Sequence, residues 1–567
     1  MKRRDFIKKS AQGTAALFYA HQVIANEAGD VRLKTEAQKK LPGKLENVNT
    51  TDIADAIRLG CRTMQNVFNA DDNQIPFFGS EVYPKASLRF SSAHSESHIP
   101  GRHLNALLSA EEAIGLELEE EAIENHRRAA FFSYSGPYKL PLNRQKIGGP
   151  LVNFCPHNLR EGFHALYALT KYRNDNKARE LAEQSIATIF DLWNPDSGWD
   201  VQRFDAAGLN FQKCQGFIHG EGRMLGPLVK YYRATGYAPA LQLALILKEK
   251  ATAEFFSPGG DYDKERFITR HSHSITCVLS SLAQLADLLC DSALMTRVKA
   301  FYDNGLREMR DEIGWSAELV YQKGSDHGEA NNTGDILETA LILGRWGYHE
   351  YYHDAERILR CHLLPSQLRD ISFISDPPNP HGKDGLRDVA NRHLGAFGFP
   401  APYGHMSVGK GRGGKISFNM DIVGGVVGSL CEAYREVARP GTGGAWVNLL
   451  FDHETSEMRV RSPYTHDCLY IEMKQSGPLF VRIPRWLNHD EVKVKGSKKA
   501  PIRTNGYLFF GNIPAGQVIR IYFPLKETQI TLSGRLHVHP IRVKLQGDAV
   551  AAMDNFGMNL TFFDPYE

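Results

Sequence analysis

The sequence has little cysteine, almost no net charge and no long apolar run. Eight cysteines are scattered over 567 residues without a C-x-x-C pair, which excludes a disulfide scaffold and gives no thiolate zinc motif. A formal charge of +2 excludes a broad basic surface for nucleic acid, and no interior segment is apolar enough to cross a bilayer. The sequence also has no P-loop, no G-x-G-x-x-G after a predicted strand and no G-x-S-x-G elbow. We therefore expect a soluble globular protein of more than one core, without nucleic acid or membrane insertion.

Basic charge gathers at the N-terminus. The chain begins Met-Lys-Arg-Arg-Asp-Phe-Ile, and a weakly apolar stretch follows over 11–25. A twin arginine in this setting resembles a twin-arginine export signal, so we expect a signal over 1–28 and a periplasmic protein. Residues 1–9 hold five basic residues and one acid, and their removal lowers the charge from +2 to −2. Any acidic ligand would then have to be held by local Arg and His side chains.

Paired amphipathic helices are predicted over residues 45–440. Within 221–236, Leu225, Leu228, Val229 and Tyr232 fall on one helical face, and Gly236 ends the helix. Comparable pairs recur roughly every 55 to 70 residues, which is too long and irregular for a solenoid repeat. This layout predicts a closed α/α toroid of about six helical hairpins, an (α/α)6 barrel.

After residues 441–444 the hydrophobic period changes from 3.6 to 2. Short alternating segments such as 458–461, 468–473 and 518–523 are separated by turn sequences such as Thr504-Asn505-Gly506. Alternating strands at this spacing predict a C-terminal β-sandwich domain of about eight strands over 444–567.

Polar residues concentrate where the first helix of each predicted hairpin begins. Since these first helices would line the inside of the toroid, their starts would ring one mouth and converge on one pocket. Helix capping is the alternative for Asp335 and Asp421, and an ordinary core or surface position is the alternative for each histidine. Capping does not explain Glu338, which lies in an otherwise apolar helix. Glu338 is therefore the strongest single candidate.

Three segments resemble a known family. The first is His327-Gly328-Glu329, and the second is Asp335-Ile336-Leu337-Glu338-Thr339-Ala340. The third is Phe480-Val481-Arg482-Ile483-Pro484-Arg485-Trp486. These segments are similar to glycoside hydrolase family 127, the β-L-arabinofuranosidase-like six-hairpin glycosidases. The resemblance spans roughly residues 50 to 550 in loose order. It implies an (α/α)6 barrel followed by a β-sandwich, and a glycosidase activity.

The chain departs from this family at its cysteines. The family's arabinofuranosidases use a zinc-bound cysteine nucleophile, whereas Ala340 stands at the first cysteine position and Asn419-Met420 stands in the region of the Cys-Cys pair. Zinc and cysteine catalysis are therefore not carried over. We expect no metal and no cofactor.

A metal-independent glycosidase needs two carboxyl groups, one to protonate the leaving oxygen and one to attack carbon or activate water. We assign acid/base catalysis to Glu329 or Glu338, and the second carboxylate to Asp421 or Asp335. The predicted substrate-binding residues are His98, Arg102, His219, Glu221, Arg223, His273, Trp315, Arg392, Tyr403 and His405. The arginines favour an acidic oligosaccharide, carrying a uronic acid or sulfate, cleaved in exo fashion. A homodimer is one option for the assembly.

Two alternatives stay open. A polysaccharide lyase on the same toroid would use His219, His273, Tyr403 and His405 to remove the proton beside a uronate carboxylate. The absent cysteines also suit a carbohydrate-binding protein without catalysis. A lyase would release unsaturated products, and a binding protein would release none.

Overall fold

The structure is a computed structural model that describes residues 41–322, 324–409, 414–441 and 443–567. The predicted export signal over 1–28 lies outside these residues. Residues 41–567 form one compact unit, with helices predominating up to residue 437 and strands from residue 438 onward. None of the helices in the described part of the chain is long and apolar enough to span a membrane.

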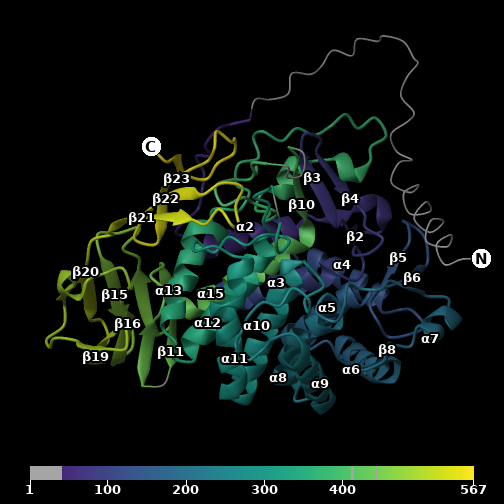
Figure 1. The fold of residues 1–567 in the computed structure, drawn as a ribbon, viewed down its shortest axis with the longest axis horizontal. Coiled ribbons are helices and arrows are strands. Elements are labelled where there is room, and N and C mark those ends of the chain that lie inside the picture. Colours follow the sequence, from purple (N-terminus) through teal and green to yellow (C-terminus); the bar gives the residue numbers. More distant parts are fainter. Residues whose placement is uncertain (1–40, 323, 410–413, 442) are drawn as a thin grey trace, which may run out of the picture. The chain divides into compact units, whose positions relative to one another are not determined.

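Contacts between successive helices close six of the described helices into an inner ring. Figure 1 labels these helices. They are α3 (Ile99–Ile114), α5 (Leu159–Arg173), α8 (Leu225–Thr235), α10 (Ser272–Leu289), α12 (Ala330–Arg345) and α15 (Met420–Val437). Each packs against the next in chain order, and α15 returns to α3. The outer partners are α2 (Ile53–Gln65), α4 (Glu120–Ser133), α6 (Asn176–Leu192), α9 (Ala238–Glu254), α11 (Ser292–Asp303) and α13 (Glu350–Ile358). The predicted α/α toroid is thereby confirmed.

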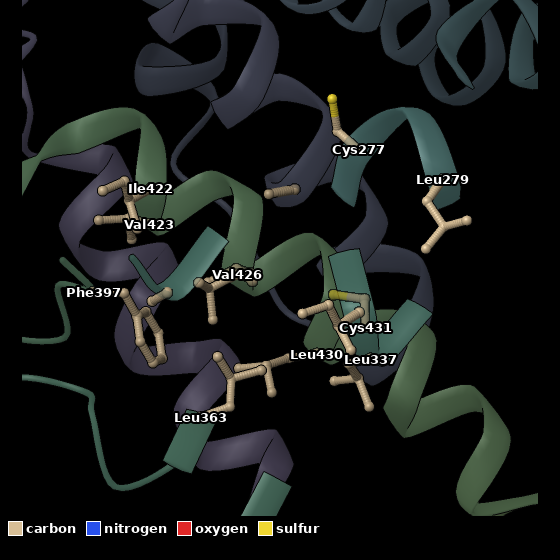
Figure 2. Close-up of a cluster of buried hydrophobic side chains, with 14 of the residues drawn as sticks. Cys277, Leu279, Leu337, Leu363, Phe397, Ile422, Val423, Val426, Leu430 and Cys431 are labelled. Atoms are coloured by element: carbon tan, nitrogen blue, oxygen red, sulfur yellow. The ribbon is translucent and has the colours of Figure 1, made fainter. Parts of the chain in front are cut away.

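Helix α15 shows why these segments fold as inner helices. Its apolar residues recur at helical spacing, and Ile422, Val426 and Leu430 are all at most 1% exposed. Figure 2 shows Ile422, Val426 and Leu430 along this helix, with Leu430 drawn near Leu337 of α12 and Leu363. Burying each such side chain contributes about 1.5–3 kcal/mol, so the stripe holds α15 in the ring.

Two five-stranded sheets form the predicted β-sandwich. One has the order β11-β12-β16-β19-β18 and the other β13-β14-β15-β20-β17. Their strands are β11 (Ala438–Gly441), β12 (Gly444–Val447), β13 (His453–Glu454), β14 (Met458–Arg461), β15 (Leu469–Met473), β16 (Gly477–Arg482), β17 (Lys493–Lys495), β18 (Ile502–Thr504), β19 (Tyr507–Ile513) and β20 (Val518–Tyr522). Alternate residues such as Val460, Ile471 and Ile519 point into a core shared by the two sheets.

A further four-stranded sheet follows the sandwich. It contains β21 (Glu527–Leu532), β22 (Ile541–Gln546), β23 (Ala549–Met553) and β24 (Asp564–Pro565). Its buried residues, among them Ile541, Val543 and Leu545, belong to the core of the helical ring rather than to the sandwich core. The segment predicted as one domain over 444–567 therefore serves two cores.

Shorter elements lead into the inner helices. They are β1 (Phe68–Asn69), β2 (Ile75–Pro76), β3 (Gly79–Tyr83), β4 (Ser87–Arg89), β5 (Leu142–Arg144), β6 (Leu151–Phe154), β7 (Trp193–Asn194), β8 (Gly198–Trp199), α7 (Val201–Ala206), β9 (Asn210–Phe211), α14 (Val389–His393) and β10 (Ile416–Asn419). Strand β10 runs directly into α15, and β6 is followed by the turn η2 (Pro156–Asn158) and α5. These strands place the polar starts of the inner helices.

Candidate active site

The inner helices begin without side-chain caps. Outer helices α2, α6 and α11 are each capped by an Asp side chain that accepts a backbone N–H. At the inner helices, His98, His271 and Glu329 occupy the cap position before α3, α10 and α12, and none of them makes a capping hydrogen bond. Asp335 and Asp421 lie inside α12 and α15 rather than at the cap. Capping, the alternative explanation from sequence, therefore does not account for these residues.

Glu161 of α5 lies at the centre of a buried ion cluster. Its side chain is fully buried, and its Oε1 lies 3.2 Å from Arg102, 3.2 Å from Arg160 and 2.8 Å from Arg223. Burial alone would raise the pKa of Glu161, but His98 and the three guanidinium groups outweigh it and hold this pKa well below its usual value. Arg102 and Arg223, predicted to bind substrate, therefore share their charge with a carboxylate of the protein.

Neighbouring imidazole rings extend from this cluster. They belong to His94, His98, His157, His219, His271 and His273. The ring centroids of His98 and His157 are 5.7 Å apart, and those of His157 and His219 are 4.5 Å apart. Burial lowers the pKa of His94 to about 4 and that of His219 to about 3, so both rings are neutral at pH 7. Since His94, His219 and His271 are only partly buried, they mark the side of this histidine cluster that meets solvent.

Asp421 is held by His98. The His98 Nε2 donates to Asp421 Oδ2 at 3.2 Å, and its Nδ1 faces Asn158 Oδ1 at 2.9 Å. Both ring nitrogens of His98 therefore face side-chain oxygen atoms. Burial would raise the pKa of Asp421, but the hydrogen bond and charge of His98 bring it below its usual value. The other oxygen, Oδ1, is buried without a hydrogen-bond partner in the described residues and can accept from a ligand.

Glu329 faces two imidazole nitrogens. Its oxygens lie 3.4 Å from His271 Nε2 and 3.8 Å from His273 Nδ1. Arg102 donates to His273 Nε2 at 2.8 Å, so a neutral His273 carries its proton on Nδ1, toward Glu329. Ser274 Oγ accepts from Arg223 and lies 3.0 Å from His271 Nδ1, which leaves the His271 proton on Nε2, also toward Glu329. Both histidines thus present N–H groups to this carboxylate.

These proton positions bear on metal binding. Two groups of side chains come close enough to share an ion, His271 with His273 and Glu329, and His273 with Cys277 and Asp335. A ligating nitrogen needs its lone pair free, but the nitrogens facing Glu329 carry protons and Arg102 occupies His273 Nε2. The guanidinium charge disfavours a cation further. A metal ion at either group would therefore require these histidines to change their proton positions.

Asp335 and Glu338 lie deeper along α12. Asp335 accepts from Thr276 at 3.0 Å and lies 3.3 Å from Arg160, and burial, opposed by Arg160, raises its pKa to about 6. Glu338 accepts from Ser280 at 3.0 Å and Ser429 at 2.9 Å. It lines a cavity of about 510 Å³ with residues from the C-terminal turns of the inner helices. Since nine residues of α-helix rise roughly 13 Å, Glu338 does not lie beside Glu329.

The remaining predicted residues divide into two groups. Glu221 lies next to the cluster and accepts from Trp199 Nε1 at 2.7 Å. Four others lie outside the cluster and contact other parts of the protein. Trp315 is fully buried and donates to Pro400 O, and Arg392 donates to the backbone of Asn66 and to Asp384. Tyr403 donates to Asp326, and His405 packs against Phe562. The polar groups of Trp315, Arg392 and Tyr403 are bonded within the protein, and substrate binding by these residues stays a prediction.

The sequence reasoning missed His94 and Arg160 as site residues and did not single out Glu161. His94 precedes His98 by one helical turn, a spacing that could have flagged it. Glu161 and Arg160 follow Asn158 at the start of an inner helix, where a buried carboxylate beside an arginine is a usable signal. Nothing local in the sequence shows that three arginines share this carboxylate.

Comparisons with known proteins place the fold. No family model and no curated protein matches the chain. A family 127 β-L-arabinofuranosidase from Geobacillus stearothermophilus T6 matches with 13% identity over 88% of this chain and 80% of its own, with a TM-score of 0.50. A second family 127 β-arabinofuranosidase matches with 13% identity over 90% of this chain and 84% of its own, with a TM-score of 0.53. A protein named glycoside hydrolase matches with 11% identity over 79% and 76%, with a TM-score of 0.51.

These likenesses establish the fold. The structural neighbours are glycoside hydrolases built on an α/α toroid, which confirms the resemblance to family 127 at the level of architecture. At this identity the activity of the neighbours does not transfer by itself. Function has to be argued from the site.

Proposed function

We propose that this protein is a glycoside hydrolase that cleaves an oligosaccharide with Glu329 and Asp421 as its carboxyl pair. The observation that carries the proposal is that both carboxylates stand at the starts of neighbouring inner helices and contact the same histidine cluster. Each is more than nine-tenths buried, and buried carboxylates among perturbed histidines favour a catalytic site. The glycoside hydrolase neighbours support the reaction class.

The two carboxyls have different surroundings, as the reaction requires. His98 and Arg102 keep Asp421 ionised, which suits the group that attacks the sugar carbon or activates water. Glu329 adjoins His271, whose partly exposed ring can exchange protons with solvent. We therefore assign acid/base catalysis to Glu329. Glu338, the strongest candidate from sequence, faces the cavity at the C-terminal turns of the inner helices in this proposal, and Asp335 pairs with Arg160.

Sugar hydroxyls suit the unfilled hydrogen-bonding groups near this pair. Asp421 Oδ1 and Asn331 Oδ1 are buried acceptors without partners in the described residues, and hydroxyl donors of a sugar would satisfy them. The approach of α15 is close because Gly425 has no side chain, and a Cβ there would lie 1.9 Å from Asn331 Oδ1. We propose that these acceptors and the neutral histidines orient the sugar ring.

The substrate charge, the export, the exo action and the metal independence expected from the sequence are part of the proposal. An acidic substrate stays a prediction that has lost part of its support, since Arg102 and Arg223 are paired with Glu161. Export to the periplasm, exo action and independence from metal also stay predictions. An oligosaccharide panel with matched neutral and uronic-acid members, assayed with and without a chelator, tests substrate charge and metal dependence together.

The decisive experiment compares three variants on whichever panel member is cleaved. We expect Glu329→Gln and Asp421→Asn to lower kcat at least about 100-fold, the usual contribution of a general acid or base. Glu338→Gln is the matched control and should keep kcat within a few-fold. Loss of activity in Glu338→Gln alone would contradict the assignment.

The same assay separates the alternative reactions. Ultraviolet-absorbing unsaturated products would indicate a lyase, which the neutral His219 beside His157 makes the second candidate. Binding of oligosaccharides without any product would instead indicate a carbohydrate-binding protein.

A further inference from the structure

Two thiols approach each other next to the histidine cluster. Cys155 directly precedes η2, and Cys214 lies in the segment between β9 and η3 (Glu221–Met224). Their Sγ atoms are 3.7 Å apart, and both residues are free and partly exposed. The two cysteines are 59 residues apart in the sequence, so the fold brings them together.

The backbones on either side of this thiol pair are already joined. Strands β6 and β9 run parallel in register, and Gln212 N donates to Phe154 O at 2.8 Å. On the other side, His157 Nδ1 donates to His219 O at 2.9 Å. Since a disulfide needs an S–S distance of about 2.05 Å, the sulfurs have to approach by roughly 1.7 Å from their separation of 3.7 Å.

We propose that Cys155 and Cys214 form a disulfide when the folded protein meets a low-molecular-weight disulfide oxidant. The Cys155 thiolate attacks the oxidant, one thiolate leaves, and a mixed disulfide forms on Cys155. The Cys214 sulfur then attacks Cys155 Sγ and releases the second thiolate. Two protein thiols are oxidised, one small disulfide is reduced to two thiols, and the two protons pass to the departing thiolates.

The surroundings fit this order of events. The Cys214 thiol donates to Cys155 and lowers the pKa of Cys155, against the effect of burial, while the same contact and burial raise the pKa of Cys214. Cys155 also lies at the start of η2 and α5, where the positive end of the helix stabilises a thiolate. Cys155 is therefore the attacking group.

The bond would tie two site segments together. Cys155 lies two residues before His157, and Cys214 lies five residues before His219. The ring centroids of His157 and His219 are 4.5 Å apart, so the disulfide would fix the spacing between the buried His157 and the partly exposed His219. This proposal concerns thiol chemistry and does not depend on the hydrolase activity.

The test is a thiol map of the full chain after equilibration in oxidised or reduced glutathione. Alkylation, digestion and mass spectrometry should find a Cys155–Cys214 linked peptide, lighter by two hydrogens, in the oxidised sample only. Cys155→Ser and Cys214→Ser should each abolish it, and Cys290→Ser, which removes an exposed thiol, should keep it. Free, alkylated Cys155 and Cys214 in a sample whose Cys290 carries glutathione would overturn the proposal.

A second readout tests the effect on the segment. Lys213 is exposed and adjoins Cys214, so native trypsin cleavage there reports local opening. Oxidation should slow this cleavage at least about fivefold in the wild type and leave it unchanged in Cys155→Ser. Equal rates in the oxidised and reduced wild type would overturn the claim that the bond holds the segment that carries His219.

Discussion

At the scale of single residues, Asp335 shows what burial does to a carboxyl group inside the ring. Its pKa rises from 3.8 to about 6, so between these values the folded protein keeps a proton that the unfolded chain has lost. Stability therefore falls as the pH rises through this window. At about 1.4 kcal/mol for each pKa unit, the ionised group costs up to about 3 kcal/mol above pH 6.

Asp335→Asn removes this titration and its pH dependence. We expect the unfolding free energy of the variant, relative to wild type, to rise by up to about 3 kcal/mol between pH 4 and pH 7. Denaturant unfolding at several pH values measures the slope. Asp421→Asn is the control without a slope in this window, because the lowered pKa of Asp421 contributes stability that is fully present above its unfolded pKa of 3.8 and is lost only as the pH falls below that value. Parallel curves for wild type and Asp335→Asn would contradict the assignment.

At the scale of elements, helix starts serve two purposes. Asp291 caps the outer helix α11 by accepting from Leu294 N at 2.9 Å, whereas His98 at the start of α3 binds Asp421 instead. Asp291→Ala should lower the unfolding free energy by about 1 kcal/mol and leave kcat unchanged. His98→Ala should mainly lower kcat and move the acidic limb of the pH–rate profile upward, since Asp421 loses the partner that lowers its pKa. Equal effects of both variants on kcat would contradict this division.

The same scale shows which parts of the structure could be predicted from sequence. Apolar periodicity locates α8, which ends at Thr235 just before Gly236, and β14, which spans Met458–Arg461 as predicted. Periodicity shows which face of a helix a residue lies on, but not which end of the helix lies at the site. It therefore groups Glu338 with Glu329, although the two residues are nine positions apart along one helix. The ion pairs of Arg102 and Arg223 with Glu161 could not be predicted, because Glu161 comes from another helix. Such long-range pairing leaves no local pattern.

At the scale of the whole molecule, the C-terminal sheet completes the ring. Leu545 of β22 is fully buried within the core of the helical ring, and Cys361, just after α13, donates to Asp548 O at 3.0 Å beside it. Alternation alone predicted a sandwich strand here, because a period of 2 shows that one face is buried but not which core receives it. The ring and the last strands should therefore unfold together.

Leu545→Ala tests this coupling against a neighbour in the same strand. Truncating a fully buried leucine costs about 2–5 kcal/mol, so the variant should lower the transition that reports the helices, followed by far-ultraviolet circular dichroism. Lys544→Ala removes a partly exposed ion pair with Glu527, which is worth at most about 1 kcal/mol, and should leave that transition nearly in place. If Leu545→Ala lowers the unfolding temperature of the strand signal while the helical transition stays at the wild-type temperature, the four-stranded sheet unfolds independently of the ring. A joint shift means that the four last strands form part of the scaffold that holds the helix starts, and with them the carboxyl pair, in position.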